Sequence, residues 1–329
     1  MKDITRDPFR EQGGRPGRWR TRVLGAPFEF TSNSRELLGI ARDAFAGVPQ
    51  HRFGRTAPTL RVALNRVRGG AAWKTPPPPR LSSGGGLLCS HVDAQNFVVV
   101  DPGSARALVQ VSDALLRDPR LVRYEFIELA VVTLALRVQG LVPLHAACVG
   151  ANGRGLLLLG GSGSGKSTLA LHAALAGFDF LAEDSVFVRP ASLDASGLSA
   201  YIHARGDALP LIVDRQVRAA VRGAPRIRRR SGVRKHELDL RRGLARLAPA
   251  PLRIVGTVVL SSRRNGGVPE RMAAAELKRV LRAEQAYAAS RPEWREFERG
   301  VLRAGGHRLG RMPPADGVAA LRKLLDGAP

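Results

Sequence analysis

The stretch LLLLGGSGSGKSTLA, from Leu156 to Ala170, constrains the fold more than any other part of the chain. It fits the pattern G-x-x-x-x-G-K-[ST], with the fixed positions at Gly160, Gly165, Lys166 and Ser167. An apolar run precedes the glycines, as in a buried strand, and the residues after them are typical of a helix. A glycine-rich turn without a ligand is the alternative, but this strand-loop-helix context favours a phosphate-binding loop.

Each position of this loop has a physical reason. Glycines let the backbone curl so that its N–H groups point at phosphate oxygens, and the following helix places its positive end there. Lys166 is predicted to neutralise the β- and γ-phosphates, and Ser167 to coordinate Mg²⁺. The predicted ligands are therefore ATP and Mg²⁺. The predicted nucleotide-binding residues are Gly160, Gly161, Ser162, Gly163, Ser164, Gly165, Lys166, Ser167 and Thr168.

The residues around the loop exclude several classes of nucleotide-binding protein. An ABC ATPase carries its signature after the loop Lys, whereas LSSGGG (Leu81 to Gly86) lies before it. The later apolar strand, Pro251 to Arg264, ends without a carboxylate. The N-K-x-D motif of a small G protein is missing from the sequence. No His-x-x-x-His or Cys-x-x-Cys spacing indicates a zinc site.

Two acids follow the loop early, in AED (Ala182 to Asp184). Asp184 lies 18 residues after Lys166, so one helix and a returning strand would bring it beside the γ-phosphate. A carboxylate there can hold Mg²⁺ or accept the proton of an attacking hydroxyl. A surface pair of acids at a strand end is the alternative.

This register resembles the C-terminal kinase domain of the HPr kinase/phosphorylase family. The resemblance rests on Val142 to Pro190 and implies a catalytic set of His145, Lys166, Glu183 and Asp184. The family's proton acceptor maps onto Asp184, and its active-site His, on the strand before the loop, maps onto His145. By itself, a histidine in LHAACV is more often a core residue. Ser167 and Glu183 are the implied metal ligands.

The chain departs from that family after the acids. The family's Arg-, Gly- and Ile-rich signature with its Mg²⁺-binding Glu is missing, and Asp207 is a guess for that Glu. Arg234 and Lys235 are candidates for a later family Arg that would clamp phosphate or substrate. Relatives of this kind act as stand-alone serine kinases, some of them on precursor peptides. The resemblance therefore implies a Ser hydroxyl on a protein or peptide as acceptor, and a homo-oligomer, since the family often completes sites across subunits.

Two other functions stay open. The missing signature would also suit an ATP-binding regulatory protein without transfer activity, and a free hydroxyl compound would make the chain a small-molecule kinase.

Charge and composition limit the partners. Lys and Arg outnumber Asp and Glu by 52 to 28, a formal net charge of +24 that attracts acidic peptides and nucleic acids. Aromatic residues make up only 5%, which argues against a nucleic-acid platform. The basic stretch 215–242 holds eleven Lys or Arg; a solvated loop and a substrate clamp both fit it. Cys89 and Cys148 lie in apolar segments, as in a cytoplasmic protein, and we expect no membrane span.

The order of strand-like and helix-like segments predicts an α/β protein. We expect a flexible basic tail over residues 1–24, a small α+β unit with a Pro- and Gly-rich linker over 25–86, and a P-loop domain over 87–329. The resemblance implies that this last domain has the HPr-kinase-like, PEP-carboxykinase-like fold.

Overall fold

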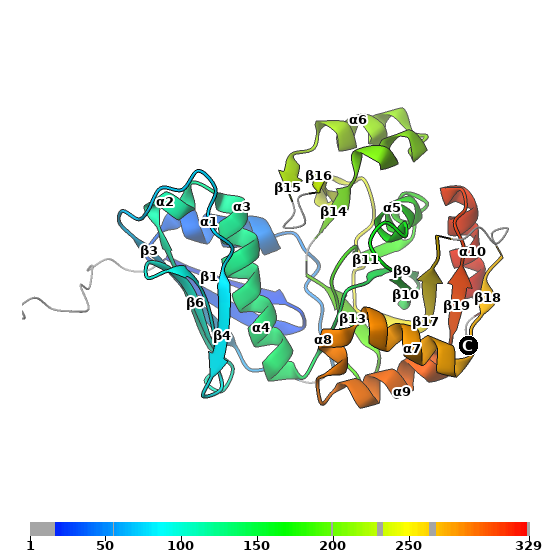
Figure 1. Ribbon diagram of the computed structural model, residues 1–329, viewed down its shortest axis with the longest axis horizontal. Coiled ribbons are helices and arrows are strands. Elements are labelled where there is room, and N and C mark those ends of the chain that lie inside the picture. Colours follow the sequence, from blue (N-terminus) through cyan, green and yellow to red (C-terminus); the bar gives the residue numbers. More distant parts are fainter. Residues whose placement is uncertain (1–16, 55, 199, 229–232, 263–267, 328–329) are drawn as a thin grey trace, which may run out of the picture. The chain divides into compact units, whose positions relative to one another are not determined.

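The computed structural model describes residues 17–54, 56–198, 200–228, 233–262 and 268–327. Within these residues the chain is a mixed α/β protein with three β-sheets and ten α-helices (Figure 1). It divides into two compact units. Unit 1 comprises Met1–Arg20, Phe28–Ala44 and Arg61–Ala130, and unit 2 comprises Thr21–Pro27, Phe45–Leu60 and Val131–Pro329. Among the described residues, no helix combines the length and apolar character that a bilayer crossing requires.

The first sheet has seven strands in the order β1-β2-β3-β7-β6-β5-β4. Their bounds are β1 Gly17–Val23, β2 Ala26–Ser32, β3 Leu60–Val67, β4 Arg80–Gly84, β5 Leu87–Asp93, β6 Asn96–Asp101 and β7 Arg106–Ser112. β3 and β7 are parallel, and β4 to β7 form an antiparallel meander. The helices here are α1 (Arg35–Phe45), α2 (Asp113–Leu116), α3 (Pro119–Leu121), a π-helix (Val122–Ile127) and α4 (Glu128–Gln139).

The expected domain boundaries are wrong in two places. The segment expected to be a flexible tail contains β1, although residues 1–16 lie outside the described residues. The linker contains β4, and β5 to β7, which we assigned to the P-loop domain, complete the first sheet. The reason is long-range: β7 pairs with β3 across the Pro-rich segment, and local sequence patterns carry no information on such pairing.

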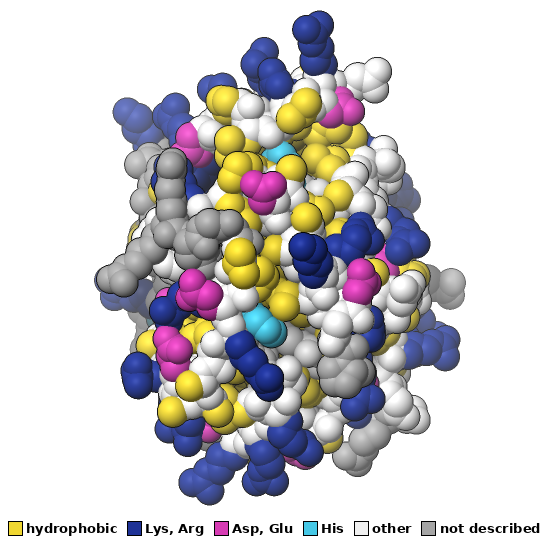
Figure 2. Space-filling view, turned by 90° about the vertical axis from the view of Figure 1, so that its right-hand side faces the viewer, with side chains coloured by type: hydrophobic (Ala, Val, Ile, Leu, Met, Phe, Trp, Pro, Cys, Tyr) yellow, Lys and Arg dark blue, Asp and Glu magenta, His cyan; other side chains and the backbone are white. Residues whose placement is uncertain are grey.

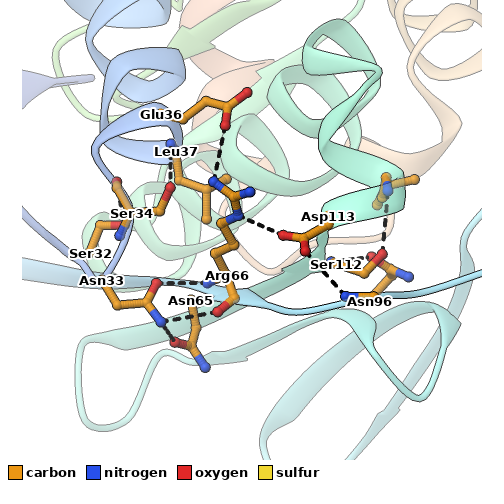
Figure 3. A network of polar contacts seen from close by, with 12 residues as sticks. Ser32, Asn33, Ser34, Glu36, Leu37, Asn65, Arg66, Asn96, Ser112 and Asp113 are labelled. Atoms are coloured by element: carbon orange, nitrogen blue, oxygen red, sulfur yellow. Dashed lines mark hydrogen bonds and ion pairs between the residues drawn. The ribbon is translucent and has the colours of Figure 1, made fainter. Parts of the chain in front are cut away.

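Polar side chains join the carboxyl ends of β2, β3 and β7 to the starts of two helices (Figure 3). Arg66 donates from Nε to Asp113 Oδ1 at 2.6 Å and from Nη1 to Glu36 Oε2 at 3.3 Å. Ser34 and Ser112 accept hydrogen bonds from the first turns of α1 and α2 and so cap them. We call this set the unit 1 network: Ser32, Asn33, Ser34, Glu36, Asn65, Arg66, Asn96, Ser112 and Asp113.

The second sheet has nine strands and belongs to unit 2. Its path is β11-β9-β10-β17-β13-β12-β8, with β19 paired to β17 and β18 to β19. The bounds are β8 Val142–Leu144, β9 Ala147–Ala151, β10 Arg154–Leu159, β11 Asp179–Ala182, β12 Val186–Val188, β13 Asp194–Gly197, β17 Leu252–Leu260, β18 Glu270–Arg271 and β19 Gly306–Leu309. β10, β17 and β19 are parallel. β8 and β12, at one end of the path, connect within a few residues to β9 and β11 at the other.

The run LLLL before the phosphate loop is apolar throughout because both faces of this sheet are covered. Leu156 and Leu158 belong to the core on the side of α5 (Lys166–Leu175) and α10 (Pro314–Asp326). Leu157 and Leu159 belong to the core on the side of α7 (Ala274–Glu284), α8 (Ala286–Ala289) and α9 (Trp294–Ala304).

A third, three-stranded sheet replaces the loop considered for the basic stretch. Its order is β14-β16-β15, with β14 Tyr201–Ala204, β15 Arg226–Arg228 and β16 Arg234–Asp239. The short 3₁₀ helices Gly206–Leu211 and Leu240–Arg242 and helix α6 (Arg215–Gly223) accompany it. The arginines of α6 flank two buried valines, Val217 and Val221, so the stretch is amphipathic rather than uniformly solvated. Arg229 and Arg230 lie outside the described residues.

Candidate active site

The phosphate loop connects β10 to α5, and its backbone needs glycine. Gly160 has φ of +141°, and a Cβ there would lie 2.7 Å from Ser164 Oγ and 2.9 Å from the Leu260 carbonyl oxygen. Gly165, with φ of +100°, is the N-cap of α5 and has no side chain that could accept from the first-turn N–H groups. The helix therefore begins without a side-chain cap, which leaves its N-terminus suited to an anion.

Lys166 lies at the start of α5 and is only 7% exposed. Its Nζ donates to the carbonyl oxygens of Gly160 and Gly161, the latter at 3.3 Å. Burial lowers the pKa of Lys166, and the nearby charges of Glu284, Asp184 and Glu183 oppose that shift. The ammonium group is thus held inside the loop, with acids close by.

The two acids of AED lie in a break between strands. The sequence predicted one returning strand here, but the structure has two, β11 paired with β9 and β12 paired with β8. Both ladders are antiparallel, and after a register shift in β11 the pair Ala182 and Cys148 is in line with the pair Val186 and Leu144. The break after β11 therefore faces the break between β8 and β9, which contains His145. This pairing explains why His145 and Asp184 meet.

Glu183 is the buried acid of the pair, with 4% exposure. Ser167 Oγ donates a hydrogen bond to its Oε1, and Lys235 Nζ lies 3.6 Å from that same oxygen. Burial opposes the charged form, but the hydrogen bond and charge of His203, with Lys235 and Ser167, hold the pKa of Glu183 below its usual range. Glu183 is therefore a carboxylate beside the hydroxyl of the phosphate loop.

Asp184 is the more accessible acid. His145 Nδ1 lies 3.1 Å from Asp184 Oδ1, and the two side chains are 56% and 32% exposed. The hydrogen bond with Asp184 raises the pKa of His145, although burial and the charge of Lys166 act in the opposite direction. This pair can contact a molecule from solvent, which Glu183 cannot.

His145 is fixed through its backbone. The buried side chain of Gln285, between α7 and α8, accepts from the His145 N–H at 2.7 Å and donates to the His145 carbonyl oxygen at 3.0 Å. The amide thus satisfies both backbone groups in the break between β8 and β9.

Three residues around the site were not found from the sequence: Gln285, which holds the backbone of His145, and His203 and Glu237. His203 on β14 contacts Glu183, and Glu237 on β16 contacts His203. β14 and β16 are each buried over three consecutive residues, Ile202 to Ala204 and His236 to Leu238, so both faces of these strands are covered and the alternation of polar and apolar residues could not show that this His and this Glu are buried.

Of the remaining predicted residues, one lies in the site and two do not. Lys235 reaches Glu183, whereas Arg234 is exposed and, as its neighbour in β16, lies on the opposite face of the strand. Asp207, the guess for a second metal ligand, is an exposed residue whose Oδ2 lies 3.0 Å from Arg205 Nη2. We call the assembled set the active-site cluster: His145, Lys166, Ser167, Glu183, Asp184, His203, Lys235 and Glu237.

The donor set fits a nucleotide with a hard divalent cation. The uncapped start of α5 and Lys166 suit phosphate oxygens, and the Ser167 hydroxyl with the Glu183 carboxylate suits Mg²⁺. Among the described residues no group of three or more His, Cys, Asp and Glu side chains is arranged to hold a metal ion by itself. Such sparse protein ligation is usual for Mg²⁺ bound together with phosphates.

Comparison of the chain with protein-family models and with curated proteins finds no match.

Proposed function

We propose that the chain is an ATP-dependent kinase with an HPr-kinase-like P-loop domain, which transfers the γ-phosphoryl group to a Ser hydroxyl of a protein or peptide. The observation that supports this best is the meeting of two pairs beside Lys166. Ser167 is hydrogen-bonded to the buried Glu183, and His145 pairs with the accessible Asp184. One pair suits the metal and the other suits the acceptor.

In this proposal Lys166 and the N-terminus of α5 bind the phosphates, and Ser167 and Glu183 hold Mg²⁺. The metal, when bound, would neutralise charge on the phosphates. Asp184 accepts the proton of the acceptor hydroxyl, whose oxygen forms the new bond to phosphorus while the bond to the ADP oxygen breaks. His145, with its raised pKa, orients Asp184 and can donate to a phosphate oxygen.

The charge of the protein favours an acidic substrate over an apolar one. On the face that Figure 2 displays, Lys and Arg side chains are spread from edge to edge, with hydrophobic and acidic side chains between them. Aromatic residues make up only 5% of the sequence, which argues against a nucleic-acid platform, so a peptide or protein acceptor is the better proposal.

The test is transfer of labelled γ-phosphate from ATP to a panel of Ser-containing peptides, acidic and neutral. Asp184→Asn should reduce kcat about 10²- to 10⁴-fold while the Kd for ATP changes little, because a proton acceptor acts only in the transition state. Asp207→Asn is the matched control, since it makes the same chemical change at an exposed acid outside the cluster.

Undiminished transfer by Asp184→Asn would overturn its role as proton acceptor. ATP binding by the wild type without transfer to any peptide would instead identify a regulatory protein, and transfer only to small hydroxyl compounds a small-molecule kinase.

A further inference from the structure

Within the active-site cluster, a buried chain of three titratable side chains runs from Glu183 to His203 and Glu237 of the third sheet. His203 Nδ1 lies 2.9 Å from Glu183 Oε2, and His203 Nε2 lies 3.4 Å from Glu237 Oε2. The backbone N–H of His203 also donates to Glu183 Oε2, at 3.3 Å. Glu183, His203 and Glu237 are 4%, 5% and 7% exposed, so all three contacts are shielded from solvent.

Because these side chains are buried, each charged group among them needs a partner. A buried carboxylate is tolerated only when it is paired and hydrogen-bonded, and here His203 and Lys235 supply the donors around two carboxylates. The imidazole lies between the two acids, one on each ring nitrogen. Of the two acids, Glu237 contacts the imidazole ring of His203. Glu183 contacts the ring and also accepts a hydrogen bond from the Ser167 hydroxyl.

The backbone fixes this arrangement. His203 on β14 and Glu237 on β16 are directly opposite in an antiparallel ladder, so their side chains lie on the same face of the third sheet. Lys235, two residues before Glu237, lies on that face too. The third sheet thus presents His203 and Lys235 to the same carboxylate, that of Glu183 in the break after β11.

We propose that His203 and Glu237 are positioning residues that hold Glu183 in the orientation in which it binds a divalent cation together with Ser167. The third sheet is then part of the metal site, although it contributes no metal ligand. Groups that orient a ligating carboxylate in this way usually change metal affinity about 10- to 100-fold when they are removed. The inference rests on the proposed function for the presence of the cation.

The test measures binding of Mn²⁺, a paramagnetic substitute for Mg²⁺, to the full chain in the presence of ADP by electron paramagnetic resonance. His203→Phe keeps a ring but removes the donor to Glu183, and we expect Mn²⁺ binding at least about tenfold weaker. His203→Asn keeps an amide donor near the place of Nδ1, and we expect a Kd within about threefold of the wild type. A ring that only filled space would give the reverse order, because Phe retains its volume and Asn does not.

Matched controls are His91→Phe and His91→Asn on β5 of the first sheet, which should both leave Mn²⁺ binding unchanged. Circular dichroism melting checks the fold of each variant. Equal Mn²⁺ affinity in folded His203→Phe and wild type would overturn the inference. Should His203→Phe not fold, a folded His203→Asn that binds Mn²⁺ more than about tenfold more weakly would overturn it instead.

The inference and the proposed function fail in different ways. Loss of Mn²⁺ binding in His203→Phe, with no phosphate transfer by the wild type, would support the inference and contradict the kinase. Transfer by the wild type with unchanged Mn²⁺ binding in His203→Phe would do the opposite. A wild type that bound no Mn²⁺ in the presence of ADP would overturn both.

Discussion

The unit 1 network and the active-site cluster are built in the same kind of place, where strands end and a helix begins. In unit 1, Ser34 and Ser112 cap their helices, and Arg66 pairs with the exposed Glu36 and the half-buried Asp113. In unit 2, α5 starts at a glycine without a side-chain cap, and the acid beside it is buried. The first arrangement satisfies its own polar groups, whereas the second leaves the helix N-terminus to an external anion.

Exposure separates the two sets as clearly as capping does. The side chains of Arg66 and Glu36 are 42% and 56% exposed, so solvent screens their ion pair and it adds little to stability. The side chain of Glu183 is 2% exposed, and it can stay charged only because its partners are fixed. A polar cluster that contains buried charge and an uncapped helix is therefore the better candidate for a functional site.

The most direct test of this difference is to remove one basic side chain from each set. Lys166→Ala should lower phosphate transfer about 10²- to 10³-fold, the size expected when one preorganised charge is lost from a transferring group. Arg66→Ala should leave ATP binding, measured by titration calorimetry, unchanged. A tenfold weaker ATP affinity in Arg66→Ala would show that the unit 1 network also serves the nucleotide.

A second test concerns the amide that holds His145. Gln285→Ala leaves two backbone groups of His145 without their buried partner, and we expect a loss of about 1–3 kcal/mol in the free energy of unfolding. Gln110→Ala is the matched control, because Gln110 is a half-buried amide on β7 of unit 1 that accepts a hydrogen bond from the Asn65 side chain. Urea unfolding measures the loss of stability in both variants. Equal losses would contradict the role of Gln285 in holding the backbone of His145.

A third test sharpens the contrast in capping. Ser34→Ala removes the hydrogen bond to the Leu37 N–H and should cost about 1 kcal/mol of stability, by urea unfolding. Addition of ATP and Mg²⁺ should raise the unfolding midpoint of wild type and Ser34→Ala alike, because the ligand acts at α5. A variant that ATP no longer stabilised would contradict the separation of the two sets.

The smallest expected effect is the pH dependence of the pair His145 and Asp184. The pKa of His145 is raised above 6.5, so the stabilisation by this pair is complete below that pH and disappears as the pH rises through the folded-state pKa. Because His145 is half exposed, the contribution stays below about 1 kcal/mol. The difference in unfolding free energy between wild type and His145→Gln should shrink from pH 6 to pH 9, and a difference that grew would reverse the assigned sign.

The sequence predicted the parts of the site that are close in the chain. Lys166, Ser167, Glu183 and Asp184 follow one another along a strand, helix and strand whose lengths can be counted. His145 came from a family resemblance, and its contact with Asp184 depends on the register of β8 and β9 against β12 and β11.

What the sequence did not reveal is long-range. His203 and Glu237 lie on two paired strands that are separated in the sequence by α6. The many arginines of that helix made its two buried valines hard to recognise. The assignment of β5 to β7 to the P-loop domain was wrong for the same reason. Pairing with a distant parallel strand such as β3 produces no pattern in the neighbouring residues of the sequence.

The two facing breaks, at His145 and at Asp184, have a consequence for how this site can evolve. Neither residue belongs to a strand, so replacing its side chain removes no rung from the ladders on either side. If the site has the proposed function, mutations there can change the reaction while the surrounding sheet keeps its hydrogen bonds. The reactivity of these two positions could therefore evolve with little loss of stability.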